Sequence, residues 1–173
     1  TKQKNIFIKM LPLFLVLFID SMGLGLIFPI LQSLILDSST NFLSSSVSHS
    51  AREITYGVMI GIFMMSWFFG AAILGDLSDM IGRKKALIIC LIGTCVGYLL
   101  AAIAVAIGSL TLLIIGRIIA GFTSGSQPIA QAAIIDESDS RYLPKNMSFM
   151  VLFITLGFVF GPILGGVLSD KNI

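Results

Sequence analysis

Charged side chains are scarce in this sequence. They make up 12% of the 173 residues, whereas 56% are hydrophobic, and the mean hydropathy is +1.00. A soluble domain needs roughly 25% charged residues to cover its surface. Because the few charges stand between long apolar runs, we expect lipid rather than water to be the main solvent. The net charge of +2 is too small to favour nucleic acid as a partner.

Cysteine and histidine are equally rare. Cys90 and Cys95 lie in one apolar run and, five positions apart on a helix, point to different sides, so we expect no metal site. His49 is the only histidine and stands in a polar segment, where we expect it to be solvated. The sequence has no constellation of nucleophile and base and no ATP-binding loop. We therefore expect no enzyme and no cofactor, and any transport would be driven by an ion gradient.

Five apolar segments are long enough to cross a bilayer as helices, which takes about 20 residues each. Their expected ranges are 10–36, 56–75, 86–108, 110–135 and 147–168. Backbone groups in hydrocarbon must be hydrogen-bonded within their own segment, so these are helices and not strands. The first run is too long for a signal-peptide core and we expect it to be retained. The sequence thus predicts an all-α, multi-pass membrane protein with no soluble domain between the spans.

The basic residues predict the orientation of the spans. With a cytoplasmic N-terminus, the inner side would carry Lys2, Lys4, Lys9, Arg83, Lys84, Lys85, Arg141 and Lys145. The outer side would carry Arg52, in the serine-rich loop 37–55, and Lys171. This excess of eight over two predicts that the N-terminus faces the cytoplasm.

A short internal repeat indicates two related halves. The sequence GDLSD at 75–79 ends the second span, and GVLSD at 166–170 ends the fifth, 91 residues later. Gly70 and Gly161 share the same separation. Because the second span runs inward and the fifth outward, the repeat predicts paired three-helix units of inverted topology, as in many secondary transporters. In that arrangement a sixth helix would follow the five predicted here.

The segment 75–85, GDLSDMIGRKK, is the most specific motif. Its glycines suit tight turns at the membrane edge, Asp79 suits a helix N-cap, and the basic cluster suits the cytoplasmic side. The segment resembles the signature loop between helices two and three of the major facilitator superfamily. The matching positions are Gly75, Leu77, Asp79, Gly82, Arg83 and Lys84, while Met80 stands where a basic residue is common. The alternative interpretation is an ordinary charged loop.

The resemblance implies a cytoplasmic gate. Asp79 and Arg83 would hold the inner side closed by contacts with the second half of the transporter, and Asp136, at the inner end of the fourth span, would join them. Alternating access needs a latch that can be broken, and surface ion pairs worth about 0–1 kcal/mol suit that need.

The fifth span contains GFVFGPILGG at 157–166. Gly157, Gly161 and Gly165 share one face, so a neighbouring helix can approach closely. Pro162 removes one backbone hydrogen bond and bends the helix. These residues alone predict only a packing face with a kink. The full pattern, with Gly166, resembles the antiporter motif of the superfamily and implies export by exchange.

A buried charge in the fourth span points to proton coupling. The stretch LIIGRIIAG at 113–121 resembles the family's helix-four motif, whose arginine is associated with coupling, although Ala120 replaces a common glutamine. Arg117 would lie roughly 10 Å below the surface, where a charge costs at least about 2.5 kcal/mol without a partner or a wet cavity. Snorkelling to the surface is the alternative. Asp20, roughly 15 Å deep in the first span, is the expected partner. We expect Asp20 to exchange the proton and Arg117 to control its charge.

The end of the first span supports the same interpretation. The stretch IDSMGLGLIFP at 19–29 resembles twelve-helix drug exporters and is especially similar to the tetracycline exporters, although Gln32 replaces a second proline. Taken alone, its glycines and Pro29 predict a flexible bend.

Several polar and aromatic residues are candidates for a substrate cavity. Gln127 and Gln131 lie one turn apart on one face, where they can bond either a substrate or a neighbouring helix. Phe28, Trp67 and Tyr98 are candidate aromatic contacts, with packing or lipid contact as the alternative.

The preferred interpretation is therefore a proton-coupled exporter of small amphipathic molecules in the bacterial inner membrane. Its expected partners are the lipid bilayer, the substrate, protons and the second half of the transporter. One alternative is an uptake permease of the same superfamily for a metabolite or a sugar. Another is a truncated membrane protein that assembles with or regulates others without transport, because only five of the fold's twelve helices are predicted.

Overall fold

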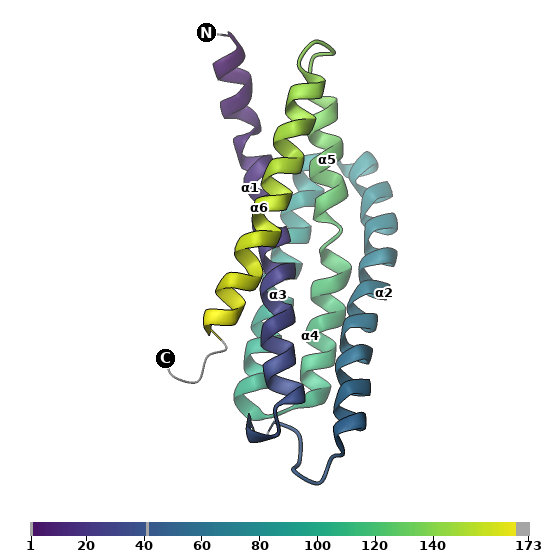
Figure 1. The fold of residues 1–173 in the computed structure, drawn as a ribbon. Coiled ribbons are helices and arrows are strands. Elements are labelled where there is room, and N and C mark those ends of the chain that lie inside the picture. Colours follow the sequence, from purple (N-terminus) through teal and green to yellow (C-terminus); the bar gives the residue numbers. More distant parts are fainter. Residues whose placement is uncertain (1, 41, 169–173) are drawn as a thin grey trace.

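The computed structural model describes residues 2–40 and 42–168, and within those ranges all regular structure is helical (Figure 1). The helices are α1 (Lys2–Leu36), the 3-10 turn η1 (Ser38–Thr40), α2 (His49–Ile81), α3 (Arg83–Ile107), α4 (Leu110–Thr123), α5 (Ser126–Asp136) and α6 (Leu143–Leu168). Five stretches are long and apolar enough to span a membrane: Ile8–Leu36, His49–Ile81, Arg83–Ile107, Leu110–Asp136 and Leu143–Leu168. The predicted all-α fold with five spans is confirmed. The repeat residue Asp170 and the outer Lys171 lie outside the described residues.

The helices form one elongated bundle (Figure 1). The N-terminus, the turn between α2 and α3 and the turn between α5 and α6 lie at one end, and the segment after α1 lies at the other. Long α1 and α6 cross each other along one side of the bundle. The chain therefore passes from end to end five times, as the apolar segments predict.

The second and fifth spans are longer than predicted. The prediction of 56–75 for the second is wrong at both ends, because α2 begins at His49, where the Ser48 side chain accepts a hydrogen bond from the Ala51 amide. At its other end, Leu77 and Ile81 pack against the core, so the helix continues to Ile81. Since helices can run beyond the hydrocarbon layer into water, hydropathy alone marks only their lipid-facing part.

The fourth span is broken, although the sequence predicts one helix over 110–135. Helix α4 ends at Thr123 and α5 starts at Ser126. Residue 128 is proline, which has no amide hydrogen to donate to the carbonyl of Ser124, four residues earlier. The indole Nε1 of Trp67 on α2 donates to that carbonyl instead, at 3.1 Å. The Gln127 amide makes a longer contact with the same carbonyl, at 3.5 Å. A neighbouring helix thus replaces the helical hydrogen bond that proline cannot make.

Small residues set how closely α1 and α6 approach. Cβ atoms built on Gly157, Gly161 and Gly165 would each lie 2.5 Å from a carbonyl oxygen of α1, those of Phe18, Met22 and Leu26 respectively. Both helices contribute every fourth residue, so the contact is a continuous backbone-to-backbone ridge. The three glycines therefore share a helix-packing face, as their spacing predicts.

The repeat is visible in the packing. Gly161 on α6 lies against the Met22 carbonyl of α1, and Gly70, its counterpart 91 residues earlier, lies against the Phe122 carbonyl of α4. The second helix of each three-helix unit thus packs on the first helix of the other unit: α2 packs on α4, and α6 packs on α1. This exchanged contact is what two interlocked, inverted units require.

Arg52 lies in α2, so its placement in the loop 37–55 is wrong. Its side chain is 2% exposed, near the start of α2. Its guanidinium donates to the carbonyl of Ile35 at 3.0 Å and to those of Leu43 and Ser44 at 3.1 and 3.0 Å. The last carbonyls of a helix have no partner inside it. Arg52 supplies a donor for one of these carbonyls of α1, that of Ile35, and its bonds to Leu43 and Ser44 hold the segment after α1 in place.

The glycine ridge predicts a sharp difference between two alanine substitutions in α6. In Gly161→Ala, the new methyl group would meet the Met22 carbonyl, and we expect a loss of about 1–3 kcal/mol in the free energy of unfolding. In Gly166→Ala, the Cβ would meet no atom within 4 Å, so we expect little change. Thermal unfolding of the complete protein in detergent measures both. Equal midpoints for the two variants would contradict the ridge.

Candidate functional site

Asp20 is a carboxylate buried between α1 and the start of α5. Its side chain is 9% exposed, and its Oδ2 accepts a short hydrogen bond from the hydroxyl of Ser126. Ser126 is the first residue of α5, so this hydrogen-bond donor lies directly after the break in the fourth span. The amino end of a helix also carries a partial positive charge, which favours a nearby anion. Broken spans place such ends at membrane depth in other transporters.

A second hydrogen bond lies beside the first. Gln127 Nε2 donates to Ser21 Oγ at 3.0 Å, so two consecutive residues of α1 pair with two consecutive residues of α5. Of the two alternatives for Gln127, a bond to a substrate or to a neighbouring helix, the structure thus shows the bond to a neighbouring helix. Gln131 and Phe28 are each half-buried. A substrate contact by any of these three residues stays a prediction.

Arg117 is also buried, but it does not contact Asp20. Its side chain is 2% exposed, and its guanidinium carbon lies 4.1 Å from the centre of the Phe63 ring. Within the described residues, its Nε and Nη1 atoms have no hydrogen-bond partner. Stacking on an aromatic ring compensates only part of the cost of burying a charge. The snorkelling alternative does not fit this position inside the bundle.

The expectation of a direct Asp20–Arg117 pair is wrong for this structure. None of the ion pairs found among the described residues joins these two side chains. The Arg117 guanidinium is instead stacked on the Phe63 ring, and the Ser126 hydroxyl is the partner of Asp20. Sequence reasoning treated the fourth span as continuous and so could not place a serine donor there.

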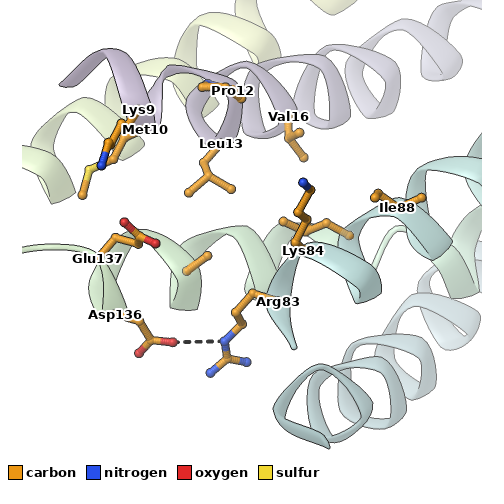
Figure 2. A pocket seen from close by; sticks show the side chains of 12 residues that line it. Lys9, Met10, Pro12, Leu13, Val16, Arg83, Lys84, Ile88, Asp136 and Glu137 are labelled. Atoms are coloured by element: carbon orange, nitrogen blue, oxygen red, sulfur yellow. Dashed lines mark hydrogen bonds and ion pairs between the residues drawn. The ribbon is translucent and has the colours of Figure 1, made fainter. Parts of the chain in front are cut away.

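Charged residues of the signature motif meet at the end of the bundle where the N-terminus lies, and Figure 2 shows the pairing of Arg83 with Asp136 there. Arg83 Nη1 lies 2.7 Å from Asp79 Oδ1, and Arg83 Nε lies 3.1 Å from Asp136 Oδ2. Arg83 also donates to the hydroxyl of Ser78 at 2.6 Å. Both carboxylates are more than half exposed. The three residues assigned to a gate are thus brought together, by ion pairs at the surface.

Two local details of that motif differ from expectation. Gly75 and Asp79 both lie inside α2, so Gly75 makes no turn and Asp79 caps no helix. The turn is made by Gly82, whose φ of 92° lies in the region that glycine tolerates best. Helix α3 then begins with no side-chain cap. The helix continues past Gly75 because the apolar residues that follow it pack on the core.

A cavity of about 600 Å³ lies beside the charge cluster (Figure 2). Its walls come from α1, α3 and the C-terminal end of α5. Its lining residues are Lys9, Met10, Pro12, Leu13, Val16, Arg83, Lys84, Leu87, Ile88, Ala133, Asp136 and Glu137. Figure 2 shows Lys84 among the lining side chains, next to Arg83. The cavity thus combines apolar walls with charged groups.

Comparison with known proteins identifies the family. The sequence profile of the Major Facilitator Superfamily matches residues 13–172. The chain belongs to this superfamily. With its five candidate membrane spans, it fits the multi-pass architecture of that superfamily, and the proteins similar to it include drug-resistance proteins.

Three relatives illustrate the similarity. The class H tetracycline resistance protein of Pasteurella multocida is 34% identical over 90% of this chain, and the class C protein of Escherichia coli is 33% identical over 90%. The quinolone resistance protein NorA of Staphylococcus aureus is 28% identical over 98% of the chain. The chain spans only 36% of the length of the two tetracycline resistance proteins. No solved structure matches the chain.

Sequence reasoning missed the polar residues that line up across the α1–α5 contact. Ser21 and Ser126 look like ordinary small residues in apolar runs. A signal was nevertheless present, because Gly125 and Pro128 flank Ser126 and Gln127, and glycine and proline close together mark an interrupted helix.

The Asp20–Ser126 contact can be tested by a double-mutant cycle. In Ser126→Ala the buried carboxylate loses its donor, and we expect a cost of about 1–3 kcal/mol in unfolding free energy. In an Asp20→Ala background, the same serine change would cost much less. Ser148→Ala is the control, because that exposed hydroxyl bonds only to the carbonyl of Pro144 in its own helix. Thermal unfolding measures all four variants, and additive effects at the two positions would refute the contact.

Proposed function

We propose that the complete protein carrying this chain is a secondary active transporter that exports small amphipathic molecules in exchange for protons, by alternating access. The observation that supports it most is Asp20, a carboxylate buried at membrane depth and bonded to the first residue of a broken helix. Ionisable residues inside a membrane are costly and are usually functional.

Asp20 is proposed as the proton carrier. The affinity of a buried carboxylate for a proton depends on burial, on nearby charges and on its hydrogen bonds. All three change if α1 moves relative to α5, because the Ser126 hydroxyl and the end of α5 would move away together. A conformational change can therefore take up a proton on one side of the membrane and release it on the other. Arg117, buried and incompletely bonded, is proposed to respond to the charge of Asp20.

The packing supports motion of helix groups as units. The glycine ridge binds α1 closely to α6, and close contacts at Gly70 and Gly121 bind α2 to α4. The ion pairs of Arg83 at the inner end are exposed, so each is worth about 0–1 kcal/mol. A gate built from such weak contacts can open without a large cost, as an exchange between two states requires.

Export rather than uptake is proposed from two observations. Helix α6 carries the complete glycine and proline pattern that resembles the antiporter motif, and its glycines pack on the helix that holds Asp20. The relatives include tetracycline and quinolone resistance proteins, and this supports amphipathic drugs as substrates. Lys9, Arg83 and Lys84 lie at the end of the bundle where the N-terminus lies, so we propose that this end faces the cytoplasm. We propose the bacterial inner membrane as its location and the rest of the transporter as its partner.

The test is proton-gradient-driven efflux of a fluorescent drug from vesicles that contain the complete gene product. We expect Asp20→Asn to abolish gradient-driven efflux while leaving the protein folded, because asparagine keeps the size and an acceptor oxygen but cannot exchange a proton. Asp139→Asn is the matched control, since Asp139 is exposed in the turn before α6, and it should efflux like the parent.

Two outcomes would count against the proposal. Undiminished efflux in Asp20→Asn would remove Asp20 from the mechanism. A folded parent that exports none of a panel of drugs, but accumulates a metabolite or a sugar along the gradient, would identify an uptake permease instead.

A further inference from the structure

Tyr98 on α3 reaches across the bundle to the helix that carries Asp20. A Cβ atom built on Gly23 of α1 would lie 2.9 Å from the Tyr98 hydroxyl oxygen and 3.5 Å from the ring carbon that bears it. Gly23 follows Asp20 by three residues, which is about 4.5 Å along the axis and on a neighbouring part of the same face. The phenol therefore ends within about one helical turn of the carboxylate.

The same tyrosine is held at the level of Arg117. Helix α3 packs on α4 through small residues on both sides of Tyr98: a Cβ on Gly97 would lie 2.6 Å from the Ala120 amide nitrogen, and one on Gly116 would lie 2.9 Å from the Ala101 amide nitrogen. Gly116 immediately precedes Arg117. Tyr98 lies within electrostatic range of both Arg117 and Asp20. It is thus placed between two charged groups that do not contact each other.

The hydrogen-bonding capacity of these groups is complementary. Arg117 has buried donors on Nε and Nη1 without an acceptor, and Asp20 has acceptor capacity beyond the bond from Ser126. A phenolic hydroxyl can donate one hydrogen bond and accept others. No hydrogen bond from it to either charge is found among the described residues, so a modest movement of α1 or α3 would be needed to form one. Gly23 leaves space for that movement, because it has no side chain.

We propose that Tyr98 is a positioning residue that links Asp20 to Arg117 through its hydroxyl. When Asp20 is charged, the hydroxyl donates to it and accepts from Arg117, so the charges interact through one oxygen atom. When Asp20 is protonated, that arrangement loses its main electrostatic attraction. Helix α1, which carries Asp20, is then free to move away from α3 and α4. The inference rests on the proposed function, because it needs a proton cycle at Asp20.

The first test is Tyr98→Phe in the complete transporter, which removes one oxygen atom and keeps the ring. In inside-out vesicles, where export carries the drug into the vesicle, we expect proton-driven drug accumulation to fall about tenfold, as for loss of a hydrogen bond to a charged group. The pH dependence of drug exchange should become weaker. Drug exchange in the absence of a proton gradient should change by less than about twofold, because the drug site is intact. Tyr56→Phe, at a half-buried tyrosine near the outer end of α2, is the control and should behave like the parent.

A second variant tests the same link with the tyrosine present. In Gly23→Ala the new methyl group would lie 2.9 Å from the Tyr98 hydroxyl oxygen and displace it, so it should reproduce the loss of pH dependence. Combined with Tyr98→Phe, it should add less than about a twofold further loss, because both changes break one link.

Three results would overturn the inference. One is a Tyr98→Phe variant with the accumulation and pH profile of the parent. Another is an equal loss of exchange and accumulation, which indicates a purely structural role. The third is full additivity of the two substitutions. If Asp20→Asn abolishes gradient-driven transport while Tyr98→Phe has no effect, the proposed function stands and the inference alone fails. If the parent itself shows no gradient-driven transport, both fail.

Discussion

A carboxylate buried at membrane depth must be bonded by the protein, and the arrangement of the first and fourth spans follows from that constraint. Asp20 obtains its donor from Ser126 because the fourth span breaks just before that serine. Because residue 128 is proline, the Ser124 carbonyl lacks the amide partner four residues later that a continuous helix supplies, and Trp67 of α2 donates to it beside a longer contact from the Gln127 amide. Three helices are thus connected through one polar interaction and its consequence. The cost of leaving backbone groups or a charge unbonded in hydrocarbon is several kcal/mol, so none of these partners is dispensable.

The rest of the bundle is held by close contact of small residues rather than by polar bonds. Glycines of α6 lie on the backbone of α1, while Gly70 of α2 lies on the backbone of α4 at Phe122 and Gly121 of α4 lies on the backbone of α2 at Phe63. In lipid, such contacts and not the hydrophobic effect bring helices together. Two groups of polar contacts lie where a conformational change would act: the α1–α5 contact at Asp20 and the exposed ion pairs of Arg83 at the end of the bundle where the N-terminus lies. This division fits a transporter that moves tightly packed helices against weak polar contacts.

Much of the fold could be predicted from the sequence, because apolar run length and glycine spacing act locally. The five spans and the packing face of Gly157, Gly161 and Gly165 follow from such patterns. The break in the fourth span was missed because its apolar run continues through it, and only the pairing of Gly125 with Pro128 signals it. Arg52 was placed in a loop because its acceptors, the carbonyls of Ile35, Leu43 and Ser44, are backbone groups that exist in any sequence. The direct Asp20–Arg117 pair was expected from opposite charge and similar depth, which do not determine where a side chain points.

The central claim is that Asp20 exchanges a proton when a substrate binds. The most direct measurement is proton release, followed with a pH indicator in weakly buffered detergent solution, when a drug is added to the purified complete transporter. Because proton and substrate would compete through linked equilibria, the account predicts release of up to about one proton per bound drug by the parent and none by Asp20→Asn. Equal release by both proteins, or drug binding to the parent without any release, would contradict it.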